Sequence, residues 1–267
     1  MKSSKEFAKE IRLETLKMVY GAKASHIGGA FSMADILSVL YNEVLNIDPL
    51  YPSDENRDRF LLSKGHACTS LYATLALKGF FPLDQLNTYA KDGSLLLSHT
   101  SHYIPGVEIS AGSLGHALPV SVGIALAAKR KNKARKTYCL VSDGELNEGS
   151  NWESILLAPQ LGLDNLILII DYNKIQSLGH VKDVIDIEPL AQKFESFRWE
   201  TYETDGHDHE ALRQTFLKCN ESNKKPKVII AHTVKGKGVS FMENKLLWHY
   251  KSPDEKQFSE ANEELQS

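Results

Sequence analysis

The sequence is poor in cysteine and has no long hydrophobic run. Its three cysteines, Cys68, Cys139 and Cys219, have the spacing of neither a disulfide framework nor a metal site. No segment approaches the roughly 18 consecutive apolar residues of a membrane span, and the charged N-terminus lacks the apolar core of a signal peptide. These absences argue against a disulfide scaffold and a membrane protein. We expect a cytoplasmic protein in a reducing compartment, with no membrane partner.

Charge of one sign is not in large excess either. The formal net charge is −3 at pH 7, which gives no electrostatic reason to expect a nucleic-acid partner. The one basic run, residues 129–136, is typical of the end of a helix and the turn after it. Hydrophobic residues make up 42% of the 267 residues, enough for a substantial core. We expect one domain over residues 1–267, with a polar tail at 253–267 that frays.

Apolar runs and helix-like segments alternate along the chain. Strands are expected at 60–63, 138–141, 166–170, 199–206 and 226–232. Helices are expected at 4–20, from a capping-box-like Ser32-Met33-Ala34-Asp35 to before Pro49, from Cys68 onward, at 117–128, between the second and third strands, and at 208–218. This alternation predicts an α/β fold, with a doubly wound, mostly parallel sheet and helices on both faces.

The stretch 137–175 contains two apolar runs, each followed by polar residues. The first ends at Asp143-Gly144, and the second ends shortly before Asn173. A helix-like segment lies between them, so the stretch is predicted to be a strand–helix–strand unit with parallel strands. The C-terminal ends of both strands would then meet at one edge of the sheet, where ligands bind in open α/β folds. Asp143 and Asn173 are therefore expected to face one crevice.

An Asp carboxylate, an Asn amide oxygen and a nearby backbone carbonyl are hard oxygen ligands, which suit Mg2+ or Ca2+ better than zinc. They are too few for a closed protein site, and Mg2+ usually completes its octahedron with water and phosphate oxygens. We therefore expect a metal bound together with a phosphorylated ligand, which Gly144 would allow to approach the backbone. The alternative is that Asp143-Gly144 is only a turn and that Asn173 only caps a neighbouring segment.

Histidines and acidic residues gather at further places. His66 follows the strand expected at 60–63, where either contact with a ligand or a hydrogen bond to a loop would explain it. Three histidines, His99, His102 and His116, lie close together, but their spacing matches no usual zinc pattern. The cluster Asp-Gly-His-Asp at 205–208 is better explained as a turn with a helix cap than as a metal site.

The combination of Asp143-Gly144 and Asn173 resembles the thiamine diphosphate motif, usually written GDG…N. The resemblance implies that thiamine diphosphate binds with Mg2+, or Ca2+, and that Asp143, Asn173 and the carbonyl oxygen of Ile175 hold the metal. It also implies that Gly144 lies against the diphosphate, with Glu145 in the same cofactor-binding segment.

The resemblance extends over roughly residues 10–250, where several segments occur in the order seen in the diphosphate-binding half of transketolases. These segments are 25–29 (SHIGG), 59–67 (RFLLSKGHA), 105–108 (PGVE), 112–116 (GSLGH), 143–145 (DGE), 171–176 (DYNKIQ) and 235–238 (KGKG). The chain most resembles the separately encoded N-terminal subunit of split transketolases, which implies the thiamine-diphosphate-binding fold.

The same resemblance implies roles near the cofactor. His66 is similar to the histidine that touches the cofactor diphosphate, and Gly112, Ser113 and Leu114 resemble the segment near the aminopyrimidine. His249 resembles a late histidine of the family that lies at both the substrate and the diphosphate, although Tyr250 stands where glycine is usual.

Further roles implied by the resemblance concern the substrate and the subunit interface. His26 is similar to a substrate-site histidine, and His99 is the best match to another, with His102 as the alternative. Glu148 resembles a glutamate at the subunit interface that links paired active sites. With His66 and His249, these residues form the expected catalytic set. Near-neutral histidines suit proton transfer to and from sugar hydroxyls and carbonyls.

Transketolases move a two-carbon ketol unit between sugar phosphates through a covalent thiamine adduct. In the family, the glutamate that activates the cofactor and the aromatic pyrimidine pocket lie in a following domain, for which 267 residues leave no room. We therefore expect this chain to be inactive alone and to pair with a C-terminal subunit that carries the pyrimidine-binding domain, as an α2β2 heterotetramer.

Other interpretations remain. One is a component of a different thiamine diphosphate enzyme, similar to 1-deoxyxylulose-5-phosphate synthase or to 2-oxo acid dehydrogenases. Another is a specialised transketolase that acts on an unusual sugar. A non-catalytic, cofactor-binding partner and a plain metabolite-binding α/β protein are the alternatives outside this chemistry.

Overall fold

The computed structural model describes residues 2–220 and 222–267 and contains a five-stranded sheet. The strands are β1 (Arg59–Leu62), β2 (Thr137–Ser142), β3 (Leu166–Tyr172), β4 (Glu200–Asp205) and β5 (Lys227–His232). Their order in the sheet is β1-β2-β3-β5-β4, and each neighbouring pair is parallel. The predicted parallel sheet is therefore confirmed, and each expected strand lies within a few residues of its predicted position.

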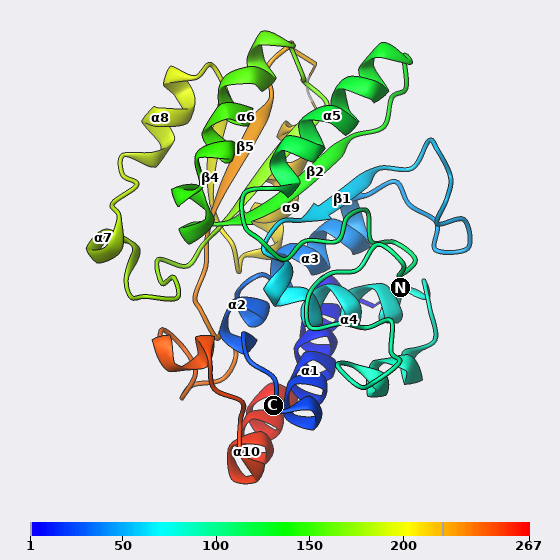
Figure 1. The fold of residues 1–267 in the computed structure, drawn as a ribbon, viewed down its shortest axis with the longest axis vertical. Coiled ribbons are helices and arrows are strands. Elements are labelled where there is room, and N and C mark those ends of the chain that lie inside the picture. The colour runs from blue at the N-terminus through cyan, green and yellow to red at the C-terminus, as the bar shows by residue number, and fades with distance from the viewer. Residues whose placement is uncertain (1, 221) are drawn as a thin grey trace.

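Ten α-helices accompany the sheet in the described residues. They are α1 (Ser4–Ala22), α2 (Ile27–Ser32), α3 (Ala34–Val39), α4 (Cys68–Lys78), α5 (Ala117–Arg130), α6 (Gly149–Gln160), α7 (Val181–Val184), α8 (Leu190–Ser196), α9 (His209–Lys218) and α10 (Glu255–Gln266). Figure 1 shows α5 and α6 in front of the sheet and α9 behind it, with α3 and α4 below. The core residues place α8 on the same face as α5 and α6, and α3 and α4 on the same face as α9. Helices cover both faces, as predicted.

Alternating strand residues build the two cores. On β3, Ile167 and Ile169 pack with α1, α3, α4 and α9, whereas Leu168 and Ile170 pack with α5, α6 and α8. All four side chains are 0% exposed. A parallel sheet covered on both faces needs apolar residues on both sides of its central strand, which explains the continuous apolar run at 166–170. No helix in the described ranges is long and apolar enough to cross a membrane.

The helix predicted after Ser32 is present as α3, which continues into a π-helical turn, Leu40–Val44. The capping box predicted at its start is wrong, because Ser32 is the last residue of α2 and the N-cap of α3, Met33, makes no side-chain cap. The Ser32 hydroxyl donates to the carbonyl of Gly29 at 3.0 Å and to Asp171 Oδ2 at 2.6 Å, so it caps no helix. Asp35, the expected partner in the box, binds Arg12 instead. Ser32 and Asp35 therefore hydrogen-bond to residues distant in the sequence and not to each other's backbone amides, as a capping box requires.

The expected frayed tail is also wrong, because residues 255–266 form α10. Asp254 and Gln257 make a capping box at its start, and Ala261 and Leu265 are buried against the chain. The ring of Phe258 stacks on Tyr20 of α1, with centroids 4.3 Å apart. The segment has few apolar residues, but they recur at helical spacing on one face, which anchors it to α1.

Candidate functional site

A cavity of about 260 Å3 lies at the C-terminal ends of β2 and β3. The described residues that line it include Lys64, Asp143, Gly144, Asn173, Ile175, Gln176, Ser177 and Lys235, together with His26, His66, His99 and His249. The strand–helix–strand prediction placed Asp143 and Asn173 in one crevice, and the structure brings them together there. They are close in space although distant in the sequence, because each follows the C-terminal end of one of two neighbouring parallel strands, β2 and β3.

Asp143 sits immediately after β2 and is 1% exposed. Its Oδ1 accepts a hydrogen bond from the Gly144 amide at 2.7 Å, and its Oδ2 accepts one from the Lys174 amide at 2.5 Å. Burial, followed by the negative charge of Asp171, raises the pKa of Asp143 to about 6. A buried carboxylate with a raised pKa lacks adequate neutralisation by cations, so a divalent ion beside it would be stabilised.

Asn173 and Ile175 add two oxygen atoms to this cavity. The Asn173 side-chain oxygen accepts from the Ile175 amide at 3.1 Å, which leaves lone-pair capacity on the amide oxygen. The Ile175 carbonyl oxygen accepts from Lys235 Nζ at 2.8 Å and so already faces a positive charge. Carboxylate, amide and carbonyl oxygens that line one cavity fit Mg2+ or Ca2+. The residues present therefore suit the metal that the sequence implied.

Four histidines cluster on the other side of the cavity. The ring of His26 lies 5.0 Å from that of His66, 5.0 Å from that of His249 and 6.4 Å from that of His99, centroid to centroid. His26 has a φ of 71°, an unusual conformation for a non-glycine residue, just before α2 begins. Four segments that are far apart in the sequence thus converge on one place, and one of them carries His99.

His102 does not join this cluster. Its Nδ1 lies 2.8 Å from the Ser110 hydroxyl, its ring packs on Tyr103, and it is absent from the described lining of the cavity. His116 also points elsewhere, toward the carbonyl of Leu114. The zinc alternative fails as well, since no group of three or more His, Cys, Asp or Glu residues in the described ranges could hold a metal.

Three of the clustered histidines, His26, His66 and His249, are held in their neutral form. Burial, followed by the charges of neighbouring groups, lowers the pKa of His26 to about 4 and that of His249 to about 3. Burial and the Lys64 charge place the pKa of His66 well below its ordinary value. Burial also lowers the pKa of Lys235 to about 8, with Asp143 acting against this shift. At neutral pH the site therefore contains neutral imidazoles that can accept a hydrogen bond.

Some expected site residues lie at the cavity wall and others behind it. Gly112, Leu114 and Gly144 line the cavity, and a Cβ at Gly144 would lie 2.7 Å from Gln176 Cβ. Because it has no side chain, Gly144 allows the loop after β3 to approach the end of β2. Ser113 is exposed and outside the described lining.

The two glutamates expected in the site are absent from the described lining of the cavity. Glu145 is fully buried, and its Oε1 accepts hydrogen bonds from the Gly115 amide at 2.8 Å and from the Ser63 hydroxyl. It ties three loops together behind the wall. Glu148 is exposed at the N-cap of α6, where a subunit interface could reach it.

Sequence reasoning gave no role to Lys64 and Lys235, although both lie in motifs that it singled out. Both are buried, at 0% and 2% exposure, and both side chains reach the cavity. Each follows the end of a strand, β1 or β5, at the same edge of the sheet as Asp143. That position was the available signal, because parallel strands deliver every residue after their C-terminal ends to this edge.

Comparison with known proteins agrees with this geometry. Residues 3–265 match the family model described as "Transketolase, thiamine diphosphate binding domain". One subunit of an apulose-4-phosphate transketolase from Actinobacillus succinogenes is 44% identical over 260 residues, 97% of this chain and 94% of the relative. Its counterpart from Phocaeicola vulgatus is 41% identical, over 95% of this chain and 90% of the relative. The matching subunit of a 6-deoxy-6-sulfo-D-fructose transketolase from a Clostridium species is 37% identical, over 97% and 94%.

Solved structures agree as well. Transketolase from Leishmania mexicana superposes with a TM-score of 0.93 at 30% identity, and transketolase from Campylobacter jejuni with 0.93 at 34%. Each match covers all of this chain but only 42% and 43% of the two solved chains. The chain thus spans less than half the length of these transketolases.

Proposed function

Because the chain belongs to the transketolase family, through its thiamine diphosphate binding domain, we propose that it is the N-terminal subunit of a two-chain transketolase. In this proposal the assembled enzyme transfers a two-carbon ketol unit from a ketose phosphate to an aldose phosphate. The observation that carries the proposal is the single cavity that contains Asp143, Asn173, the Ile175 carbonyl and four histidines.

The proposed cofactor is thiamine diphosphate with Mg2+ or Ca2+. Asp143, Asn173 and the Ile175 carbonyl would hold the metal, and the cavity wall at Gly112, Leu114 and Gly144 would receive the cofactor. Lys235, with its amine 2.8 Å from the Ile175 carbonyl and 3.1 Å from His249 Nδ1, offers a cation for the diphosphate. The cofactor supplies the carbanion chemistry when bound, and this chain supplies binding, orientation and proton acceptors.

The histidines would act on the sugar. His26, His66 and His249 have lowered pKa values and are neutral at pH 7, so each can accept a hydrogen bond from a substrate hydroxyl and orient it. His99 completes the cluster, and its position beside His26 supports it over His102 as a substrate-site residue.

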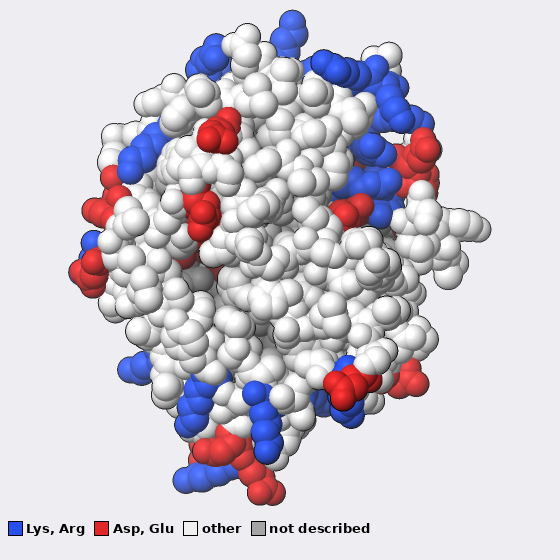
Figure 2. Space-filling view, viewed as in Figure 1, with Lys and Arg blue, Asp and Glu red and all other residues white. Residues whose placement is uncertain are grey.

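A partner chain is part of the proposal. Among the described residues that line the cavity, Asp143 is the only carboxylate, and it is the proposed metal ligand. The carboxylic acid and aromatic pocket that the cofactor ring needs would come from a C-terminal subunit with the pyrimidine-binding domain, in an α2β2 assembly. Figure 2 shows few Lys, Arg, Asp or Glu side chains across the centre of the face that carries α5 and α6 in Figure 1. Charge depletion is typical of the centre of an interface, and Glu148 lies at the start of α6.

The names of the relatives support a further proposal for the substrate. They specify apulose 4-phosphate and 6-deoxy-6-sulfo-D-fructose, so an unusual ketose of this kind is a second candidate beside the common ketose phosphates. A cationic and imidazole-rich cavity suits an anionic, hydroxyl-rich ligand of either kind.

The test is titration of thiamine diphosphate and Mg2+ into the chain, alone and with a candidate C-terminal subunit, followed by ketol-transfer assays. Donors would be xylulose 5-phosphate, apulose 4-phosphate and 6-deoxy-6-sulfo-D-fructose. We expect tight binding and turnover in the mixture only. Turnover by the chain alone would contradict the need for a partner. A mixture that binds no cofactor would overturn the proposed function, and binding without turnover on any donor would point to a non-catalytic cofactor-binding protein.

A further inference from the structure

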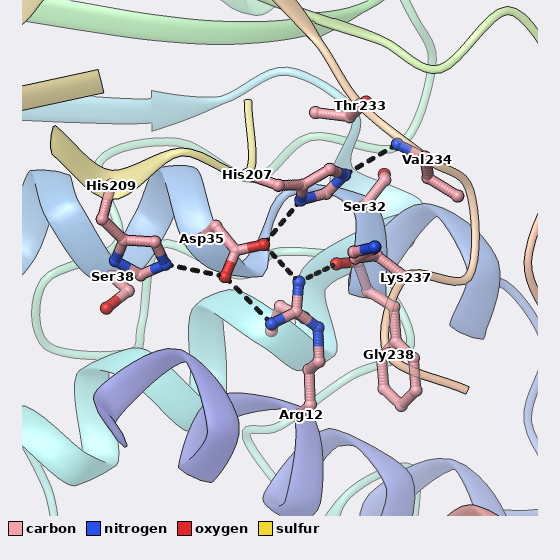
Figure 3. A network of polar contacts seen from close by, with 12 residues as sticks. Arg12, Ser32, Asp35, Ser38, His207, His209, Thr233, Val234, Lys237 and Gly238 are labelled. Carbon is pink, nitrogen blue, oxygen red and sulfur yellow. Dashed lines mark hydrogen bonds and ion pairs between the residues drawn. The ribbon is translucent and has the colours of Figure 1, made fainter. Parts of the chain in front are cut away.

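The Asp-Gly-His-Asp turn at 205–208 does more than cap a helix. Asp208 caps α9, as expected, by accepting from the amides of Glu210 and Ala211 at 3.0 and 3.1 Å. His207 and His209, on either side of Asp208, instead point to a buried carboxylate on α3 (Figure 3). The proposed function gives these side chains no role.

Asp35 is the centre of this network. Its carboxylate lies 3.0 and 2.6 Å from the two terminal nitrogens of Arg12 on α1, in a bidentate pair. It also lies 2.6 Å from His207 Nδ1 and 3.0 Å from His209 Nε2. Four donors thus converge on one carboxylate whose side chain is 8% exposed. The Arg12 guanidinium balances its charge, which makes the arrangement tolerable in a buried place.

His207 connects this network to the segment after β5. Its Nε2 accepts a hydrogen bond from the backbone amide of Val234 at 2.8 Å. The imidazole must therefore carry its proton on Nδ1, and that proton is donated to Asp35. Asp35 selects the tautomer, and the tautomer makes Nε2 an acceptor. Figure 3 shows the ring of His207 between Asp35 and Val234.

Two glycines allow close contact between the 205–208 turn, the segment after β5 and Arg12. A Cβ on Gly206 would lie 2.4 Å from Thr233 Cγ2, so the 205–208 turn is packed against the segment after β5. A Cβ on Gly238, which has a φ of +97°, would lie 3.3 Å from Arg12 Cδ. The segment 233–238 is thus held by the turn at one end and by Arg12 at the other. This contact is independent of the hydrogen bonds.

Lys235 immediately follows Val234 and extends into the cavity, where its amine contacts the Ile175 carbonyl at 2.8 Å. A lysine side chain has a flexible four-carbon stem, so the position of its amine depends on a fixed backbone. We infer that His207, oriented by Asp35 and Arg12, is a positioning residue that fixes the segment 233–238 and so places the Lys235 amine in the cavity.

The consequence for ligands rests on the proposed function. With the amine held in place, the cavity presents a preorganised cation to an anionic group such as a diphosphate, and little conformational entropy is lost on binding. Loosening of the 233–238 segment would weaken anion binding without any substitution among the residues that line the cavity.

The first experiment needs no ligand. Hydrogen–deuterium exchange of the full chain is followed at the 233–238 segment in the wild type, His207→Asn and His207→Gln. Gln can place its amide oxygen near the position of Nε2 and accept from Val234, whereas Asn reaches only the position of Nδ1. We expect exchange in this segment about tenfold faster in H207N, as for one lost hydrogen bond, and close to wild type in H207Q. Equal exchange in all three proteins would overturn the inference.

Two further variants keep this test decisive. Gly206→Ala should also speed exchange in the 233–238 segment, because its Cβ would push the turn that carries His207 away from Thr233 without any substitution of His207 or Asp35. His232→Asn is the matched control, since His232 ends β5 but pairs with Glu203 at 2.8 Å and is 40% exposed. Exchange as fast in H232N as in H207N would contradict a specific role for His207.

The second experiment uses Mg2+ with inorganic pyrophosphate, titrated into the same proteins with and without Lys235→Met. We expect about fivefold weaker binding in H207N and no further loss when H207N is added to K235M, because His207 acts through Lys235. Additive losses would overturn the link to Lys235. Absence of binding in the wild type, to both pyrophosphate and thiamine diphosphate, would count against the proposed function instead, and the exchange experiment would still decide the positioning role.

Discussion

The Lys64 ammonium and the Asp171 carboxylate form an ion pair in which both side chains are 0% exposed. Lys64 follows β1 and Asp171 lies on β3, so the pair spans the sheet edge beneath the cavity. Asp171 also accepts hydrogen bonds from the hydroxyls of Ser32 and Thr233. Burial alone would raise the pKa of Asp171, but Lys64 and these hydroxyls hold it below its ordinary value. The pair therefore connects α2, β1, β3 and the segment after β5.

Loss of one partner should be far worse than loss of both. Lys64→Met leaves a buried, negatively charged Asp171 without its cation, and we expect it to cost about 3–5 kcal/mol of unfolding free energy. Asp171→Asn in the same chain removes that charge and should restore part of the loss. Urea unfolding of the two single variants and the double variant measures the coupling. Strictly additive losses would contradict a coupled pair.

Asp143 should make the metal-free chain sensitive to pH. Its folded pKa of about 6 lies above the ordinary value of 3.8, so the folded chain binds more protons than the unfolded chain between these values. Its contribution to stability therefore falls as pH rises from about 4 to about 6. The difference in unfolding free energy between wild type and Asp143→Asn should become more favourable to wild type by on the order of 2 kcal/mol from pH 7 to pH 4. A difference independent of pH would count against the raised pKa.

Metal binding should show the opposite dependence on pH. Mg2+ must displace the proton from Asp143 below about pH 6, so its affinity in the presence of thiamine diphosphate should fall by up to about tenfold per pH unit there. D143N should bind Mg2+ weakly at every pH and show no such slope. Calorimetric titration at several pH values measures both. A wild-type Mg2+ affinity that stays constant from pH 7 to pH 5 would contradict the proposal that Asp143 is a metal ligand.

His249 should destabilise the fold in acid. His249 has a folded pKa of about 3 against an ordinary 6.5, so the unfolded chain binds the extra proton in that window. Stability from this group is complete above pH 6.5 and is lost as pH falls. Because the ring is partly exposed, His249→Asn should reduce the loss between pH 7 and pH 5 by no more than about 1 kcal/mol. Denaturant unfolding at the two pH values tests this, and an unchanged slope in H249N would contradict it.

Two glycine substitutions should act in opposite directions. A Cβ at Gly65 would lie 1.9 Å from the carbonyl oxygen of Ala111, so Gly65→Ala should displace the loop that leads to Gly112 and cost about 1–3 kcal/mol or more. Gly123 lies within α5 with nothing within 4 Å of its would-be Cβ. Gly123→Ala should stabilise the chain by roughly 0.5–1 kcal/mol, because alanine loses less backbone entropy in a helix. Thermal unfolding of the two variants compares them directly, and a stabilised G65A would contradict the close approach.

The sequence by itself determined the sheet and the edge of it at which Asp143 and Asn173 meet. The apolar runs before Asp143 and Asn173 are long enough to be buried strands, and parallel strands carry the residues after them to one edge. The prediction of each strand, and of the residue that follows it, depends only on residues close together in the sequence. For that reason the fold class and the common crevice could be predicted before any contact was known. The roles of these residues toward metal and cofactor remain our proposal.

Tertiary packing decided the rest. The segment 94–116 has no helical or strand periodicity, so only its docking could bring His99 rather than His102 beside His26. The final helix α10 has too few apolar residues to be recognised without the surface of α1 that it covers.

Asp35 illustrates the physical reason. Locally it completes a capping-box pattern with Ser32, but in the structure it binds Arg12, His207 and His209. A buried charge takes the best donors that the whole fold brings within reach, and a local hydrogen bond cannot compete with a cation and two imidazoles. Strand ends follow from neighbouring residues, whereas the partners of buried polar groups follow from the three-dimensional arrangement of the chain.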